Sequence, residues 1–136
     1  MRVLILVLIT LVTQFSVPTL AFAAEKKHVV MILWRGVTDA EKGFMEYLSS
    51  KMPVSYTLLD AKRDRETLSN YINNIDSYDA DLIYTFGTTT TLSLLGTEDK
   101  PTSFRQHSNT PVVFSIVTDP VGSKIISEDN SEHRNF

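Results

Sequence analysis

Residue types that can bind a small polar ligand follow two short apolar runs, 80–86 and 112–117. The polar residues after these runs are Gly87, Thr88, Thr89, Thr90, Thr118 and Asp119. Apolar runs of this length, bounded by glycine or polar residues, are typical of strands that are buried on both faces of a parallel sheet. Ligands of open α/β sheets bind outside the carboxyl ends of the strands, so these two turns indicate binding more than catalysis.

A third group of candidate residues, Trp34, Arg35 and Thr38, lies at the end of the mostly apolar run 28–34 and just after it. The guanidinium of Arg35 can bind a carboxylate through two hydrogen bonds, and the indole of Trp34 can stack on a planar ligand. A helix that starts near Thr88 offers free backbone amides and a partial positive charge, which also suit a carboxylate. The three groups together predict a site for a small carboxylate-bearing solute.

Each candidate residue also has a purely structural explanation, and the sequence leaves both open. Asp119 before a proline is typical of a helix N-cap followed by the first helical residue. Thr38 and Glu41 form a capping box, in which each side chain satisfies a backbone amide of the other. Gly87 can serve as a turn glycine, Trp34 can close the end of the sheet, and Arg35 can be a surface cation.

The order of the elements predicts an α/β fold. We expect strands at 28–34, 54–59, 80–86 and 112–117, helices at 38–51, 64–75 and 88–95, and irregular structure at 97–110. Strands that alternate with helices through right-handed crossovers form a parallel sheet, here a Rossmann-like sheet with strand order 2-1-3-4. This order brings the loops after strands one, three and four to the same edge.

The longest of these motifs resembles a known family. The run Pro-Val-Val-Phe-Ser-Ile-Val-Thr-Asp-Pro-Val-Gly at 111–122, together with Phe-Gly-Thr-Thr at 86–89, is similar to the tryptophan-type substrate-binding proteins of ABC transporters. Trp34-Arg35-Gly36 and the run 60–64 extend the resemblance over most of residues 28–126. It implies the amino-terminal lobe of a type I periplasmic-binding-protein fold, truncated before the second lobe, and an amino acid or similar solute as ligand.

The amino terminus predicts export. A basic residue at position 2, an apolar stretch and the sequence Ala-Phe-Ala at 21–23 are typical of a signal peptide spanning residues 1–23. The remaining chain is expected to comprise an α/β lobe at 24–126 and a polar tail at 127–136. With 0 cysteines there is neither a disulfide nor a lipid-bearing amino-terminal cysteine, so a soluble periplasmic or secreted product is expected.

Composition argues against several other classes. A net charge of −3 without a basic cluster provides no electrostatic footprint for nucleic acid or for an anionic membrane. His28, His107 and His133 lack metal-ligand spacing, and no G-x-S-x-G motif occurs. We therefore expect no metal, no cofactor, no nucleic-acid partner and no enzymatic activity.

The favoured hypothesis is a periplasmic substrate-binding component of an ABC-type importer, which passes its ligand to a membrane permease. Because the second lobe of the family is missing from this sequence, a separate lobe or a homodimer is expected to complete the site, and strand four is expected to leave an unpaired edge. Two alternatives remain: a truncated remnant without transport function, and a periplasmic sensing or interaction module.

Overall fold

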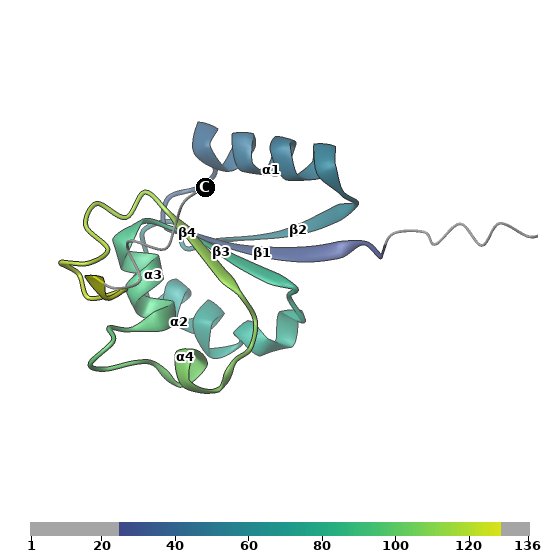
Figure 1. The fold of residues 1–136 in the computed structure, drawn as a ribbon. Coiled ribbons are helices and arrows are strands. Elements are labelled where there is room, and N and C mark those ends of the chain that lie inside the picture. The colour runs from purple at the N-terminus through teal and green to yellow at the C-terminus, as the bar shows by residue number, and fades with distance from the viewer. Residues whose placement is uncertain (1–24, 129–136) are drawn as a thin grey trace, which may run out of the picture.

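The computed structural model describes residues 25–128 as alternating strands and helices (Figure 1). The elements are β1 (Lys27–Leu33), α1 (Asp39–Lys51), β2 (Val54–Asp60), α2 (Arg65–Asn73), η1 (Ile75–Tyr78), β3 (Leu82–Phe86), α3 (Gly87–Leu95), α4 (Ser103–His107) and β4 (Val112–Ser115). The predicted signal peptide at 1–23 lies outside the described residues.

The four strands form one parallel sheet in the order β2-β1-β3-β4, as the sequence predicts. Pairing is in continuous register, with Met31 of β1 opposite Leu58 of β2 and Tyr84 of β3. Helix α1 covers one face, and α2, α3 and α4 lie on the opposite face (Figure 1). The carboxyl ends of the strands therefore share one edge, which we call the carboxyl edge.

Strand β1 lies at the centre of the core. Its residues from Val29 to Leu33 are at most 2% exposed, because neighbouring strands pair on both sides and helices cover both faces. Successive side chains point to opposite faces of the sheet: Val30 and Ile32 pack toward α2, whereas Val29 and Met31 pack toward α1. This two-sided burial explains why the strand is a continuous apolar run.

The helix starts follow the caps that the sequence predicts. The side chain of Asp64 accepts a hydrogen bond from the Thr67 amide at 2.6 Å, and Thr38 with Glu41 forms the capping box of α1. The region 97–110 was predicted to be irregular, and this was wrong, because it contains α4. There the Thr102 side chain accepts a hydrogen bond from the Arg105 amide at 3.3 Å, so local capping forms a short helix within a polar segment.

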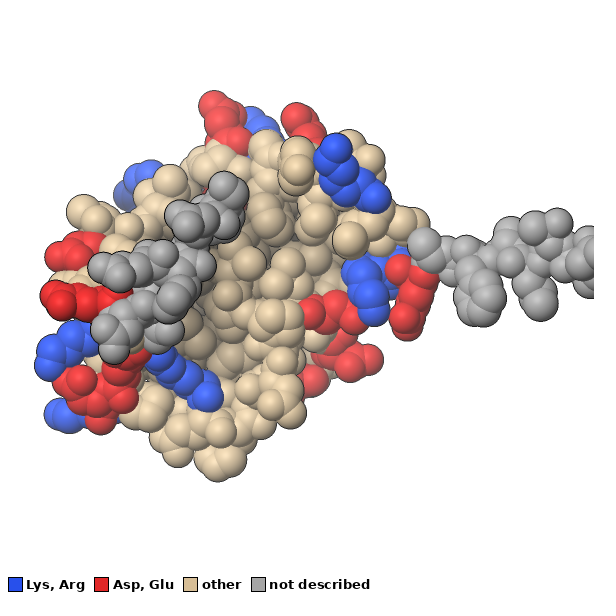
Figure 2. Space-filling view, viewed as in Figure 1, with Lys and Arg blue, Asp and Glu red and all other residues tan. Residues whose placement is uncertain are grey.

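Strand β4 and the turn after it differ from the prediction. The strand ends at Ser115, before the left-handed residue Ile116 with φ of 53°, and Val113 is 42% exposed. The exposure of Val113 contradicts the expected coverage of both faces, whereas the expected unpaired edge is present, because among the described residues β4 pairs with β3 alone. Figure 2 shows charged side chains near the margins of this face, leaving its middle, where β4 lies, uncharged.

The helix for which Asp119 is a candidate N-cap does not form within the described residues. Instead, Asp119 Oδ1 accepts a hydrogen bond from the Gly122 amide at 2.7 Å, which closes a tight turn. The segment then folds back: Ile125 is 1% exposed, and its carbonyl accepts a hydrogen bond from Arg105 at 2.9 Å. Burial of Ile125 favours this return of the chain over the extension of a helix toward solvent.

A buried polar network joins α1 to the sheet. Glu41 is fully buried, and its carboxylate accepts hydrogen bonds from the Thr38 amide at 2.7 Å, the Thr38 hydroxyl at 2.5 Å and the Tyr84 hydroxyl at 2.9 Å. The Tyr84 hydroxyl also contacts Ser115 Oγ on β4. Burial, with a further contribution from Glu41, raises the pKa of Tyr84 to about 12, so the hydroxyl keeps its proton and donates to the carboxylate.

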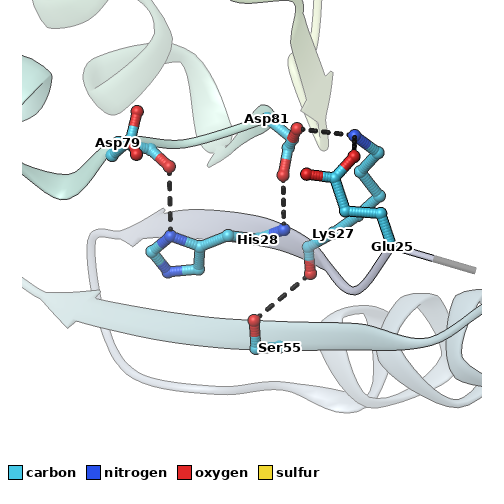
Figure 3. A network of polar contacts seen from close by, with 6 residues as sticks. All are labelled: Glu25, Lys27, His28, Ser55, Asp79 and Asp81. Atoms are coloured by element: carbon cyan, nitrogen blue, oxygen red, sulfur yellow. Dashed lines mark hydrogen bonds and ion pairs between the residues drawn. The ribbon is translucent and has the colours of Figure 1, made fainter. Parts of the chain in front are cut away.

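A second polar network lies at the amino ends of the strands, opposite the carboxyl edge (Figure 3). Asp81 accepts a hydrogen bond from the His28 amide at 2.8 Å and pairs with Lys27 Nζ at 3.0 Å. The His28 ring lies between the carbonyl of Asp79 and the hydroxyl of Thr57, at 3.3 and 2.8 Å. These contacts hold the start of β1 against the start of β3 and against β2.

We expect Tyr84→Phe to destabilise the fold by about 1–3 kcal/mol, because one oxygen of the buried Glu41 carboxylate loses its hydrogen-bond donor. The free energy of unfolding in urea measures this effect. Tyr47→Phe is the matched control, since Tyr47 lies on α1, the helix that carries Glu41, but is 66% exposed. Equal stability of the two variants would contradict the structural role of the network.

We expect Asp81→Asn to reduce the acid sensitivity of the fold. The His28 amide, and then Lys27, lower the pKa of Asp81 below its ordinary value of 3.8. The carboxylate therefore stabilises the fold above that value, and this contribution disappears as the pH falls through the lower pKa of the folded state. Urea unfolding at neutral and acidic pH should show a shallower loss for Asp81→Asn than for the control Asp39→Asn, whose side chain is 99% exposed.

Candidate ligand-binding site

The loops after β1 and β2 are joined at the carboxyl edge by one carboxylate. Asp60 Oδ1 accepts hydrogen bonds from the amides of Gly36 and Lys62, both at 2.9 Å. Gly36 has φ of 81°, a conformation that glycine adopts without steric cost. The Asp60 side chain therefore links the backbone just after Trp34 and Arg35 to the turn after β2.

The turn after β2 is held in an unusual conformation. Lys62 and Arg63 have φ of 51° and 63°, in the left-handed region that non-glycine residues seldom adopt. Two backbone hydrogen bonds maintain this turn, from the Arg63 amide to the Trp34 carbonyl at 2.7 Å and from the Asp64 amide to the Ala61 carbonyl at 2.8 Å. The turn therefore depends on the first loop and adds two cations to the carboxyl edge.

Arg35 connects the first loop to the end of β3. Its guanidinium carbon lies 5.6 Å from the centre of the Phe86 ring, within the range of a cation–π contact. Phe86 is 6% exposed, so the ring is a fixed surface, whereas Arg35 itself is exposed. Among residues 25–128 no carboxylate forms an ion pair with Arg35, so its N–H groups are available to a bound anion.

Helix α3 begins beside Arg35 without a side-chain cap. Its N-cap position is Phe86, which has no side-chain acceptor for the first amides, and Gly87 follows with φ of 82°. No heavy atom outside the adjoining residues lies within 4 Å of the position that a Cβ of Gly87 would occupy, so the backbone here is open to approach. Thr88 and Thr89 are half-buried in this first turn.

Thr90 has a different place from its neighbours. It is fully buried, and its hydroxyl donates to the Phe86 carbonyl and to the Gly87 carbonyl, the latter at 3.0 Å. Thr91 is also buried and donates to the Gly87 carbonyl at 2.8 Å. These two hydroxyls stabilise the start of α3 from within, whereas Thr88 and Thr89 lie closer to solvent.

The remaining predicted site residues do not all lie beside Arg35 and the start of α3. Trp34 is half-buried and packs on the hydrophobic cluster beneath α2 and α3, and Thr38 is engaged with Glu41. Thr118 and Asp119 are exposed beyond the end of β4, and Asp119 closes its own turn. The structure thus brings the loop after β1 and the start of α3 together through Arg35 and Phe86. Among the described residues no hydrogen bond or ion pair joins Thr118 or Asp119 to them.

Sequence reasoning missed the residues that position the site. Asp60 was part of a recognised run but was not singled out, although a carboxylate at the end of a strand is well placed to accept amides of adjoining turns. Phe86 was treated as an ordinary strand residue, and Tyr84 was not connected with Glu41. The spacing of residues within one element could not reveal these contacts between elements.

Comparison with known proteins finds similarity in structure alone. No family model matches the sequence, and no curated protein matches it. Three solved structures share its fold, each at probability 1.00. One is a conserved domain protein from Vibrio cholerae, with a TM-score of 0.59 and 16% identity over 75% of this chain.

The other two carry descriptions of binding. An ABC domain in complex with L-Trp from Streptococcus pneumoniae has a TM-score of 0.58 and 14% identity over 75% of this chain. CD0873 from Clostridium difficile, a substrate-binding protein with adhesive properties in a ligand-free, open structure, has a TM-score of 0.58 and 18% identity over 74% of this chain.

These similarities show the fold and its extent. The chain spans 34% of the length of each matched structure, so it corresponds to one part of them. With the four-stranded parallel sheet in the order 2-1-3-4, the chain has the α/β architecture of one lobe of a substrate-binding protein. In the described part of the chain, no helix is long and apolar enough to cross a membrane.

We expect Asp60→Ala to loosen the carboxyl edge, because the amides of Gly36 and Lys62 lose their common acceptor. The loss in stability should be about 1–3 kcal/mol. Hydrogen exchange at these two amides should accelerate by a larger factor than exchange at core amides, which reports the loss of global stability. Asp39→Ala, which alters an exposed ion pair on α1, is the control. Unchanged exchange in Asp60→Ala would contradict the proposed positioning role.

Proposed function

We propose that this protein is the periplasmic substrate-binding component of an ABC-type importer and binds a small organic solute such as an amino acid. The observation that supports this most is the pairing of Arg35, held over Phe86, with the uncapped start of α3. Both groups favour an anion, and both belong to the carboxyl edge, where ligands of open α/β sheets bind.

The chemistry of the edge suits the carboxylate of an amino acid. Arg35 supplies charged N–H donors, the first amides of α3 supply further donors, and the Gly87 backbone is open to close approach. Trp34 and the hydroxyls of Thr88 and Thr89 are proposed to contact the remainder of the ligand. The L-Trp complex of the pneumococcal neighbour supports an amino acid as the first class of ligand to test.

A second protein surface is proposed to complete the site. The carboxyl edge is open to solvent on one side, and hydrogen bonds there are weaker than in a closed, water-excluded cleft. We propose a second lobe or a second copy of the chain that closes over the edge. The uncharged surface over β4, with Val113 42% exposed, supports such a contact (Figure 2).

The proposal includes the processing and location of the chain. Residues 1–23 are proposed as a signal peptide, residues 24–126 as the solute-binding lobe and residues 127–136 as a polar tail. The product is proposed to act in the periplasm or outside the cell, without a cofactor or catalytic activity, and to deliver its ligand to a membrane permease. The exposed edge of β4 also favours a second candidate function, an interaction or sensing module that docks on a membrane receptor.

We expect the purified protein to bind at least one amino acid saturably, and Arg35→Gln to weaken this binding by about tenfold through loss of a charge-assisted hydrogen bond. Calorimetric titration with L-tryptophan and then the other common amino acids measures the affinity. Lys51→Gln is a matched control, because Lys51 also lies over an aromatic ring, that of Tyr47, at 5.3 Å, but on α1. The proposal fails if no amino acid binds or if both variants bind equally well.

A further inference from the structure

A groove of about 820 Å³ lies between α2, α3 and α4, on the face of the sheet opposite α1. Its volume is within the range of about 300–1,000 Å³ that is usual for ligand sites. Of the residues predicted for the carboxyl-edge site, Thr89 alone lines this groove. The groove is therefore a separate surface, and its chemistry can be considered by itself.

The floor of the groove is apolar and firmly built. Leu68 and Ile75 are 2% and 4% exposed and belong to the hydrophobic cluster beneath α2, and Phe104 of α4 packs against the same cluster. Because Leu68 and Ile75 are almost completely buried, the apolar surface that a ligand can reach is that of the partly buried Ile72 and Phe104, which the cluster holds in place.

The walls carry hydroxyl groups without partners. Ser69 lies on α2, Thr89 and Ser93 lie one turn apart on α3, and Ser103 begins α4. Within residues 25–128 none of these four hydroxyls forms a hydrogen bond, unlike the buried Thr90 and Thr91. Each can donate to one group of a ligand and accept from another.

The two ends of the groove carry opposite charges. Arg65 is the first residue of α2, and Asp76 lies in η1 beyond the other end of that helix. At a rise of about 1.5 Å per residue, Arg65 and Asn73 are about 12 Å apart along α2, and Asp76 lies further along the chain, in η1. Among the described residues neither side chain forms an ion pair, so a cation and an anion face the groove from opposite ends.

We propose that this groove binds a short extended peptide of about five residues, with its free carboxyl terminus at Arg65 and its free amino terminus at Asp76. An extended chain rises about 3.3 Å per residue, so about five residues span the length of α2 between Arg65 and η1, whereas a single amino acid is too short. Alternate side chains of the peptide contact the partly buried Ile72 and Phe104, and its backbone groups form hydrogen bonds with the hydroxyls of the walls.

Other occupants fit the groove less well. A nucleic acid or an anionic lipid would place negative charge along the groove and leave Asp76 opposed by a like charge. A purely apolar helix would bury Arg65 and Asp76 without partners, which is costly. The zwitterionic peptide satisfies both ends, and this inference does not depend on the function proposed for the carboxyl edge.

The probe is the pentapeptide Ala-Leu-Ala-Leu-Ala with free termini, titrated into the full chain by calorimetry. We expect saturable binding that weakens by about tenfold when the peptide carries a carboxyl-terminal amide or an amino-terminal acetyl group. Arg65→Gln should weaken binding of the free peptide and remove the effect of the amide, and Asp76→Asn should do the same for the acetyl group. Each variant is thus combined with the blocked peptide in a double-mutant cycle, which tests whether the side chain contacts that terminus of the peptide.

Arg63→Gln is the control, since Arg63 is an exposed cation near Arg65 that does not line the groove. Arg35→Gln should leave peptide binding unchanged, which separates failure of this proposal from failure of the carboxyl-edge site. The proposal is overturned if the folded wild-type chain does not bind the pentapeptide, or if it binds the free and blocked peptides equally. Those two results need no variant, so an unfolded variant cannot hide them.

Discussion

The hydrogen bond from Tyr84 to the buried carboxylate of Glu41 is the contact on which the arrangement of the layers depends. It joins the first turn of α1 to the middle of the sheet, and the same tyrosine hydroxyl reaches Ser115 at the end of β4. A buried carboxylate without donors would be strongly unfavourable, so α1 must start where Thr38 and Tyr84 can both reach it. The position of α1 then sets the path of the loop that carries Arg35.

The carboxyl edge combines fixed backbone with exposed charge. Asp60 holds the loops after β1 and β2, and the left-handed residues Lys62 and Arg63 depend on hydrogen bonds to neighbouring backbone. Strained residues persist where the surrounding structure determines them, and they often cluster at functional sites. The position of Arg35 is likewise set by its surroundings, because its guanidinium lies over the buried ring of Phe86. The anion site that we propose at this edge is thus largely preformed.

Much of the fold could be predicted because its signals are local. The continuous apolar run of β1, the capping box at Thr38 and the N-cap at Asp64 each lie within a few residues, and the alternation of strands and helices determines the parallel order. Prediction failed where distant contacts compete with local preference. Asp119 has the sequence of a helix start, but burial of Ile125 returns the chain as a tight turn.

The sequence by itself determined the first three strands, the helices α1, α2 and α3, the order of the sheet and the residue types at the carboxyl edge, but not α4 or the turn at Asp119. Tertiary structure decided which of those residues point toward solvent: the hydroxyl of Thr90 turns into α3, whereas Arg35 is held over Phe86. It also formed the groove, because Arg65 and Asp76 line a common cavity only when α3 and α4 pack beside α2. The physical reason is that propensity and capping act over one or two turns, whereas burial and pairing of polar groups depend on elements far apart in the chain.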